Sequence, residues 1–166
     1  MRLSQLLLDM DYTVLQGEQD REISTLVYDS RKVEQDSVFV CISGAVRDGH
    51  DLAPEVAAKG AAVLIVEKEV TVSDEVTVIR VADSRLALAQ LSAAYFDHPA
   101  KELTTIGITG TKGNTTATYM VRSILEASGF KTGLIGTIET IIGDTVIPSV
   151  NTTPESYVVQ ESFRKM

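Results

Sequence analysis

The most constraining feature of this chain is a β-like run that turns through glycines into a helical pattern at residues 105–116, which read TIGITGTKGNTT. Gly110 and Gly113 stand three residues apart, and glycines let a backbone approach an anion closely. The amide groups of the turn that follows lie at a helix N-terminus, which carries partial positive charge. The stretch predicts a phosphate-binding loop with a nucleotide as its ligand. An ordinary strand-to-helix turn without a ligand is the alternative.

This loop departs from the usual phosphate-binding loop at one position. The usual loop ends in Gly-Lys-Ser/Thr, where the lysine reaches the β- and γ-phosphates and the hydroxyl contacts Mg²⁺. Here Asn114 stands in the lysine position, Thr115 supplies the hydroxyl, and Lys112 lies two residues too early to replace the lysine. Losing a charge-assisted hydrogen bond costs about 1.5–3 kcal/mol of binding. Losing a transition-state donor costs roughly a hundred- to a thousandfold in rate. We therefore expect impaired ATP chemistry.

Charge and composition exclude several classes of protein. The 166 residues carry a net charge of −8, with an isoelectric point near 4.7. Because a nucleic-acid-binding surface needs a basic face, no nucleic-acid partner is expected. The one cysteine, Cys41, lies in an apolar run typical of a buried strand in a reducing compartment. The first residues hold only a short apolar patch, so we expect no signal peptide and no membrane insertion. A cytoplasmic protein is predicted.

The first hundred residues predict a small mixed α/β domain. Apolar runs typical of strands occupy residues 12–15, 23–28, 38–43, 61–66 and 76–81. Helical patterns occupy residues 2–9, 51–60 with Asp51 as the N-cap, and 84–96, which is apolar nearly all round and should be mostly buried. The sequence His98-Pro99-Ala100 ends the last helix. We therefore expect a domain boundary near residue 100.

The remaining residues predict the start of a parallel-sheet domain. A strand at 103–106, the glycine loop, a helix that Gly129 ends and a strand at 131–136 would form a parallel β-α-β unit. One face of that helix carries the apolar residues Ala117, Met120, Val121, Ile124 and Leu125. A hairpin around Gly143-Asp144 follows, and then a helix capped by Thr153 with Pro154 in its first position. Such a sheet lacks most of its strands, and an unfinished edge invites self-association.

Four stretches, in order along the whole chain, resemble segments of the Mur ligase family, and specifically of its MurE type. Residues Tyr28–Val33 match the family's DSR segment, and Phe39–His50 match the next segment, with Asp48-Gly49-His50 at its end. Residues Gly107–Thr116 are similar to the family's Gly-Thr-Asn-Gly-Lys-Thr-Thr loop, and Asn151–Pro154 match its substrate loop. Each stretch alone is weak, but their order and spacing together are highly specific.

The resemblance implies an ATP-dependent ligase of peptidoglycan synthesis. Such an enzyme adds a third amino acid, meso-diaminopimelate or L-lysine, to UDP-MurNAc-L-Ala-D-Glu through an acyl phosphate, with ATP and Mg²⁺. Residues 1–99 would then be the UDP-substrate-binding domain, and residues 100–166 the first part of the central ATP-binding domain. The catalytic residues would lie beyond Met166, so we expect a truncated product that does not catalyse ligation by itself.

The resemblance also assigns binding residues, position by position. The UDP end of the substrate would contact Tyr28, Ser30, Ala45, Val46 and Arg47, and the muramoyl-dipeptide would contact Asn151, Thr152 and Thr153. ATP would be held by Gly110, Thr111, Lys112, Gly113, Asn114, Thr115 and Thr116, with Thr115 on Mg²⁺. Simpler roles remain open for some of these residues. Ser30 could cap a turn, Thr153 could cap a helix, and Arg47, Asp48 and His50 could belong to a solvated loop.

Three alternatives to a MurE-type ligase remain open on the sequence. Another Mur ligase or a folylpolyglutamate-type ligase could share the central domain, although the DSR and DGH segments favour the MurE type. A non-catalytic module that binds a UDP-linked precursor would fit both Asn114 and the early stop. A purely structural protein with a fortuitous turn is the third alternative.

Overall fold

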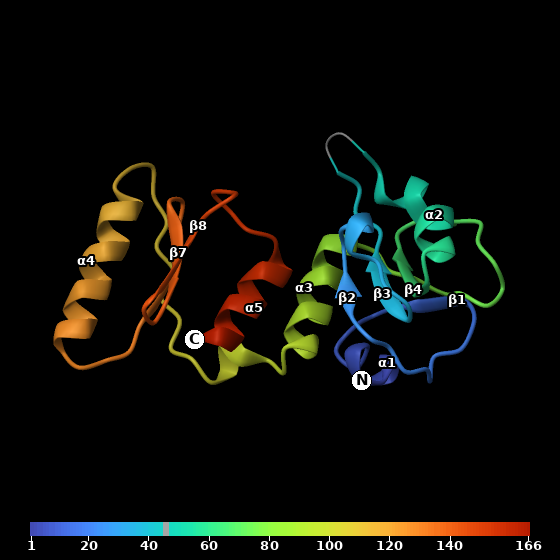
Figure 1. Cartoon of the computed structure of the whole chain (residues 1–166), viewed down its shortest axis with the longest axis horizontal. Helices are drawn as coiled ribbons and strands as arrows, with labels where there is room; N and C mark the ends of the chain where they lie inside the picture. The colour runs from blue at the N-terminus through green and yellow to red at the C-terminus, as the bar shows by residue number, and fades with distance from the viewer. Residues whose placement is uncertain (45–46) are drawn as a thin grey trace. The chain divides into compact units, whose positions relative to one another are not determined.

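Parallel strands form where the sequence carries unbroken apolar runs. The computed structural model describes residues 1–44 and 47–166, and the chain divides into two compact units, Met1–Tyr95 and Phe96–Met166 (Figure 1). Unit 1 holds a five-stranded sheet in the order β1-β5-β4-β3-β2. Its strands are β1 (Thr13–Gln16), β2 (Leu26–Val27), β3 (Ser37–Val40), β4 (Ala61–Val66) and β5 (Thr77–Arg80). Strands β2 to β5 are parallel, and β1 pairs antiparallel with β5.

Helices cover both faces of this sheet. They are α1 (Leu3–Leu6), α2 (Ala53–Ala58) and α3 (Ser84–Tyr95), and the 3-10 turns are η1 (Ser30–Lys32) and η2 (Gly49–Leu52). Ala53 and Val56 of α2 pack with alternate sheet residues such as Phe39 and Leu64. Because strand side chains alternate between faces, the neighbouring residues point to the opposite face, where α3 contacts β2 and β4. All residues of β3 and β4 are buried, as a parallel sheet covered on both faces requires.

The carboxyl ends of four parallel strands bring distant segments to one edge. The segments that leave this edge begin at Tyr28 after β2, at Cys41 after β3, at Glu67 after β4 and at Val81 after β5. Ligands of open α/β sheets bind at this edge, because the connecting loops there are free to carry polar groups. The edge is therefore where a site of unit 1 is expected.

Unit 2 is built around an antiparallel sheet. Strands β6 (Gly133–Ile135), β7 (Glu139–Ile142) and β8 (Thr145–Pro148) pair in that order, and Gly143 makes the β7–β8 turn with a φ of +56°. The helices are α4 (Asn114–Ala127) and α5 (Ser156–Lys165), with a 3-10 turn η3 (Pro99–Lys101). The predicted hairpin and the helix ended by Gly129 are confirmed.

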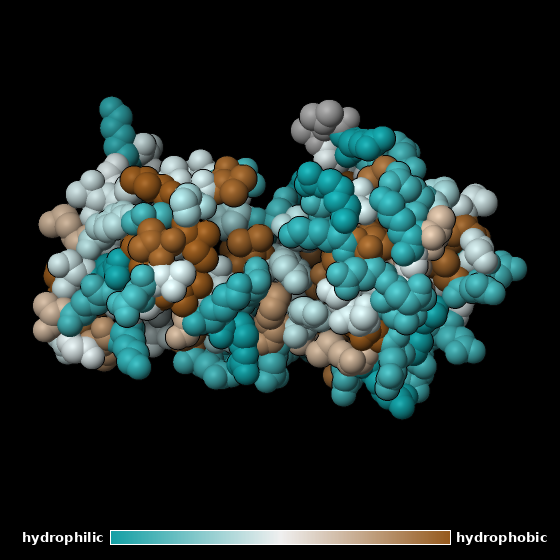
Figure 2. All heavy atoms as spheres, in the orientation of Figure 1, coloured by the Kyte–Doolittle hydropathy of each residue, from teal (hydrophilic) through white to brown (hydrophobic). Residues whose placement is uncertain are grey.

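The expected parallel β-α-β unit is not formed. Residues 104–110 lie outside any strand, and β6 pairs antiparallel with β7. A strand needs a neighbour for its backbone donors and acceptors, and no described segment pairs with these residues in a sheet. Ile106 accordingly has 59% of its surface exposed. The apolar face of α4 is likewise only partly covered, with Met120 62% and Ile124 65% exposed. Hydrophobic patches are visible on this unit in Figure 2.

Three further local predictions were wrong. Asp48, rather than Asp51, caps the segment before α2, because its side chain accepts the His50 amide. Helix α3 is buried along one face, whereas Leu86 is exposed. Helix α5 begins at Ser156 with Glu155 as its N-cap, since the ψ of 152° at Glu155 is extended and excludes the preceding residues from the helix. No helix in residues 1–44 and 47–166 has the length and apolarity that a membrane span needs.

Candidate substrate and nucleotide sites

Three predicted substrate residues meet in one hollow at the carboxyl edge of the unit 1 sheet. Tyr28 and Ser30 come from the turn after β2, and Arg47 comes from the loop after β3. The hollow has a volume of about 290 Å³, and its other lining residues are Asp29, Phe39, Ile42, Gly49 and Leu52. Apolar walls with a few polar groups are typical of small-molecule sites. Ala45 and Val46, also predicted here, lie outside the described residues.

Asp29 organises the turn that carries Ser30. Its carboxylate accepts the Arg31 amide at 3.0 Å and the Arg31 guanidinium at 2.7 Å, which caps η1. These hydrogen bonds from Arg31 lower the pKa of Asp29 to about 2. The Lys59 ammonium donates to the Ser30 carbonyl at 3.2 Å from the end of α2. The capping role considered for Ser30 therefore belongs to Asp29, and Ser30 lines the hollow.

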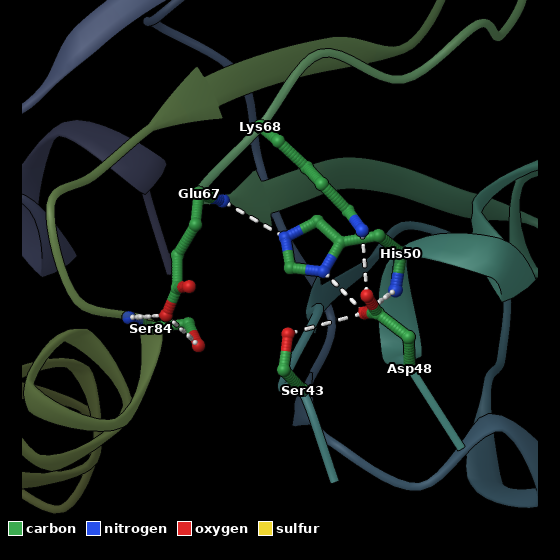
Figure 3. Close-up of polar contacts among 6 residues, drawn as sticks. All are labelled: Ser43, Asp48, His50, Glu67, Lys68 and Ser84. Atoms are coloured by element: carbon green, nitrogen blue, oxygen red, sulfur yellow. Dashed lines mark hydrogen bonds and ion pairs between the residues drawn. The ribbon is translucent and has the colours of Figure 1, made fainter.

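Asp48 is the centre of a polar cluster beside this hollow (Figure 3). One carboxylate oxygen, Oδ1, accepts the His50 amide at 2.9 Å, His50 Nδ1 at 2.6 Å and the Ser43 hydroxyl at 3.3 Å. The other, Oδ2, accepts the Lys68 ammonium at 2.6 Å. The Lys68 contact and the two His50 bonds hold the pKa of Asp48 well below its ordinary value. The side chain is therefore a carboxylate anchor rather than a proton donor.

The hydrogen-bond partners of the His50 ring assign the roles of its two nitrogens. The backbone amide of Glu67 donates to His50 Nε2 at 2.9 Å, so Nε2 carries no proton. Nδ1 is then the protonated nitrogen, and it donates to Asp48. His50 is only 4% exposed. The solvated-loop interpretation is therefore wrong for His50, which spans the space between the loop after β3 and the end of β4.

Glu67 links this cluster to the start of α3. Its Oε1 accepts both the amide and the hydroxyl of Ser84 at 2.7 Å, which lowers the pKa of Glu67. Asp83 accepts the amides of Arg85 and Leu86 at 2.8 and 2.9 Å. A second hollow of about 250 Å³ lies at this point, lined also by Ile42 and Ser43. Two carboxylates already satisfy the amides of the α3 N-terminus, so this end is not an anion site.

In unit 2 the glycine loop leads directly into α4. Gly113 is the N-cap residue with a φ of +80°, a conformation that glycine adopts without strain. The Asn114 side-chain amide donates to the Gly110 carbonyl at 2.8 Å, which closes the loop on itself. Lys112 and Thr116 are exposed, and Thr115 is partly buried in the first turn of the helix. The loop thus presents backbone amides of a 14-residue helix to an anion, without a cation at position 114.

The predicted contacts of the muramoyl-dipeptide, Asn151, Thr152 and Thr153, are exposed in the segment before α5. Thr153 is not the helix cap, since Glu155 holds that position. No hydrogen bond among the described residues joins this segment to the loop at 110–116. In the described part of the chain, no three His, Cys, Asp or Glu side chains gather as a metal site. The roles of Asn151, Thr152 and Thr153, and that of Thr115 toward Mg²⁺, remain predictions.

Comparison with known families decides the assignment. Residues 22–96 match the family model described as "Mur ligase family, catalytic domain", and residues 108–166 match "Mur ligase middle domain". The chain belongs to the Mur ligase family. This Mur ligase chain spans about a third of the length of the curated relatives it matches.

Relatives and solved structures agree with this assignment. A protein of Clostridium perfringens (strain 13 / Type A), named UDP-N-acetylmuramoyl-L-alanyl-D-glutamate--2,6-diaminopimelate ligase, is 46% identical over 166 residues, which are 100% of this chain and 34% of that protein. A crystal structure of MurF from Acinetobacter baumannii has a TM-score of 0.62 at 25% identity, covering 99% of this chain and 33% of that one. A MurF ligase from Thermotoga maritima in complex with ADP has a TM-score of 0.54 at 24% identity, over 84% of this chain and 28% of that one, and shows the fold alone. The predicted α/β class and the MurE-type resemblance are confirmed.

Sequence reasoning missed the partners of the Asp48 cluster. Lys68 lies 20 residues from Asp48, and Glu67 lies 17 residues from His50. Both follow β4, whose strand pattern was recognised from the sequence. The sequence did hold a signal for these partners, since both are charged residues directly after a buried parallel strand. The carboxyl end of such a strand lies at the same sheet edge as the loop after β3.

Proposed function

We propose that this chain supplies the precursor-binding part and the ATP loop of a MurE-type ligase, which adds 2,6-diaminopimelate to UDP-MurNAc-L-Ala-D-Glu. The observation that carries the proposal is the hollow in which Tyr28, Ser30 and Arg47 come together. The names of the relatives favour diaminopimelate over L-lysine as the third amino acid. In this proposal residues 1–99 bind the UDP-linked substrate, residues 100–166 begin the ATP-binding domain, and the protein acts in the cytoplasm.

The hollow suits a nucleotide of the UDP type. Phe39, Ile42 and Leu52 provide apolar walls against which a uridine can be buried. The guanidinium of Arg47 can bind a diphosphate through two parallel hydrogen bonds. The hydroxyl of Ser30 adds a neutral donor on the opposite turn. We propose that Ala45 and Val46 contribute to the same contact and that Asn151, Thr152 and Thr153 contact the muramoyl-dipeptide.

The loop at the start of α4 is the proposed site of ATP phosphates. Gly110 and Gly113 allow close approach, and the first amides of α4 have no partner within the helix. Bound ATP would supply the phosphoryl group that activates a substrate carboxylate, and Thr115 would contact its Mg²⁺. This chain's own residues hold and orient the phosphates there. Asn114, which binds the Gly110 carbonyl, offers an amide where the family motif has an ammonium.

A calorimetric titration with UDP-MurNAc-L-Ala-D-Glu, with UMP as competitor, tests the substrate assignment. We expect saturable binding that UMP displaces and that Arg47→Ala weakens at least tenfold. Arg80→Ala is the matched control, because Arg80 is an exposed arginine of the same unit that lines neither hollow. Binding that is equally insensitive to both substitutions, or no binding by the folded chain, would contradict the proposal.

A second function, a non-catalytic precursor-binding module, is favoured by one observation. The Asn114 side-chain amide donates a hydrogen bond to the Gly110 carbonyl, at the position where the usual loop has a lysine. The two functions are separated by titration with ATP and Mg²⁺ after the UDP-linked precursor has been bound. ATP binding supports the ligase, and precursor binding without any ATP binding supports the module.

We also propose that unit 2 self-associates through its sheet edges. Strands β6 and β8 are both edge strands, and all four residues of β8 are exposed, with Val146 and Ile147 among them. Unpaired edges pair with other chains unless charges prevent it. Light scattering after size exclusion should show concentration-dependent dimers, which Val146→Lys reduces. A chain that stays monomeric at all concentrations would refute this proposal.

A further inference from the structure

The loop that carries Arg47 is closed at both ends by one carboxylate. Ser43 and Asp48 form an isolated antiparallel bridge, and the Gly44 amide donates to the Arg47 carbonyl at 3.0 Å. Asp48 then accepts the hydroxyl of Ser43 and the ammonium of Lys68. The carboxylate therefore ties the start of the loop, its end and the segment after β4 together (Figure 3). Arg47 is directly attached to this anchor through the backbone.

His50 fixes where that anchor stands relative to the sheet. Its imidazole donates to Asp48 from one side of the ring, at 2.6 Å, and accepts the Glu67 amide on the other, at 2.9 Å. A planar ring with partners at both nitrogens is a rigid spacer. Glu67 is fixed in turn by Ser84 at the start of α3. The position of Asp48 is thus set by two elements of the core, and not by the loop alone.

We propose that His50 is a positioning residue for the UDP site: it holds Asp48, and through it the backbone of Arg47, where the guanidinium can meet the phosphates of the bound nucleotide. The inference rests on the proposed function, because it requires a uridine nucleotide in the hollow lined by Tyr28, Ser30 and Arg47. A purely structural His50 would instead stabilise the fold without acting through Arg47. The two roles make different predictions for the affinity of folded variants.

Two substitutions separate the two hydrogen bonds of the ring. His50→Asn keeps a donor close to the position of Nδ1, and so keeps the contact with Asp48. His50→Gln reaches the position of Nε2, so it can accept the Glu67 amide but loses the donor to Asp48. A hydrogen bond to a charged group is worth about 1.5–3 kcal/mol, and each 1.4 kcal/mol is tenfold in affinity. We expect the dissociation constant for UDP to rise at least about tenfold in His50→Gln and to stay within about threefold in His50→Asn.

A control variant tests whether lower stability alone weakens the binding of UDP. Ile79→Val deletes a methyl group from a fully buried position of β5 that lines neither hollow. It lowers the stability of the same unit while leaving the cluster intact, and we expect UDP affinity to stay unchanged. All titrations are made well below the unfolding midpoint of each variant. Should His50→Gln fail to fold, Lys68→Met takes its place, because it removes a donor to Asp48 from an exposed side chain.

A double-mutant cycle with Arg47 gives the decisive readout. If His50 acts through Arg47, His50→Gln adds little to the loss of UDP affinity already caused by Arg47→Ala. Its effect adds fully to that of Ser30→Ala, because Ser30 lies in the turn after β2 and not in the loop that carries Arg47. Additivity with both partners, or unchanged affinity of His50→Gln, would overturn the positioning role while leaving the proposed function intact. Absence of UDP binding by the folded wild-type chain would overturn the proposed function and this inference together.

Discussion

A single methyl group added at Gly49 should destabilise unit 1, because backbone atoms surround the position where it would lie. A Cβ placed there would lie 2.7 Å from the amide nitrogen of Ile42, 2.8 Å from its carbonyl oxygen and 3.2 Å from the carbonyl carbon of Cys41. All three are backbone atoms, which cannot rotate away. The φ of Gly49 is not in the left-handed region, so the penalty of Gly49→Ala arises from these contacts and not from backbone strain.

The magnitude follows from two terms. Overpacking of a closely packed site costs about 1–3 kcal/mol. The Gly49 amide donates to the Ile42 carbonyl at 2.9 Å, and weakening that bond adds about 0.5–1.5 kcal/mol. We expect Gly49→Ala to lower the free energy of unfolding by about 1.5–4.5 kcal/mol. Because about 1 kcal/mol moves the midpoint of a domain of this size by roughly 4–8 °C, the midpoint should fall by at least about 6 °C.

Thermal unfolding followed by far-ultraviolet circular dichroism measures this change. Gly107→Ala is the matched control, because a Cβ at Gly107 meets no atom within 4 Å and its φ is not positive. We expect that variant to stay within about 0.5 kcal/mol of the wild type. A midpoint for Gly49→Ala equal to that of the control would refute the reasoning, since it would mean that the backbone at Ile42 yields without cost.

Three further predictions concern both units. Asn114→Lys should strengthen ATP–Mg²⁺ binding about tenfold or more by adding a charge-assisted bond. Asn114→Ala, which only removes the hydrogen bond to the Gly110 carbonyl, should not strengthen ATP–Mg²⁺ binding. Equal affinities of the wild type and Asn114→Lys in calorimetry would contradict this. Arg31 lowers the pKa of Asp29 from 3.8 to about 2, so the unfolded state binds the proton more readily. The stability from Asp29 is therefore full above about pH 5 and is lost as the pH falls toward 2. In urea unfolding measured at a series of pH values, Asp29→Asn should reduce the loss of stability between about pH 5 and pH 2. An unchanged pH dependence of stability would contradict this role of Asp29. Burial raises the pKa of the Cys41 thiol to about 12, so a disulfide reagent at neutral pH should label it only at the rate of unfolding. Immediate labelling of Cys41 in the native chain would contradict this prediction.

The elements that sequence patterns predicted well are those with local signals at both ends. Strand β4 coincides with the apolar run at 61–66, which follows Gly60. Helix α4 begins after Gly113 and ends before Gly129, where left-handed glycines stop the helix on both sides. Each boundary depends on residues within one turn of it. Local conformational preference is sufficient there, because no distant partner is needed.

The predictions that failed needed distant partners. The run at 103–106 has strand propensity, yet a strand exists only when a neighbour accepts and donates its backbone hydrogen bonds. No described segment does so for these residues. The cap of α5 moved from Thr153 to Glu155, because the extended backbone at Glu155 excludes a helix before it. In both cases tertiary context overrode a plausible local pattern.

The sequence by itself determined the α/β class, the order of motifs that identifies the family, and three residues that line one hollow at the sheet edge. These follow from residue types and from their spacing along one chain. Only the tertiary structure decided that Asp48 and the buried His50 are hydrogen-bonded to Lys68 and Glu67. The reason is physical. Which side chains meet at the edge of a sheet depends on strand order and register, and a buried polar group accepts whichever partner that packing brings within hydrogen-bond distance.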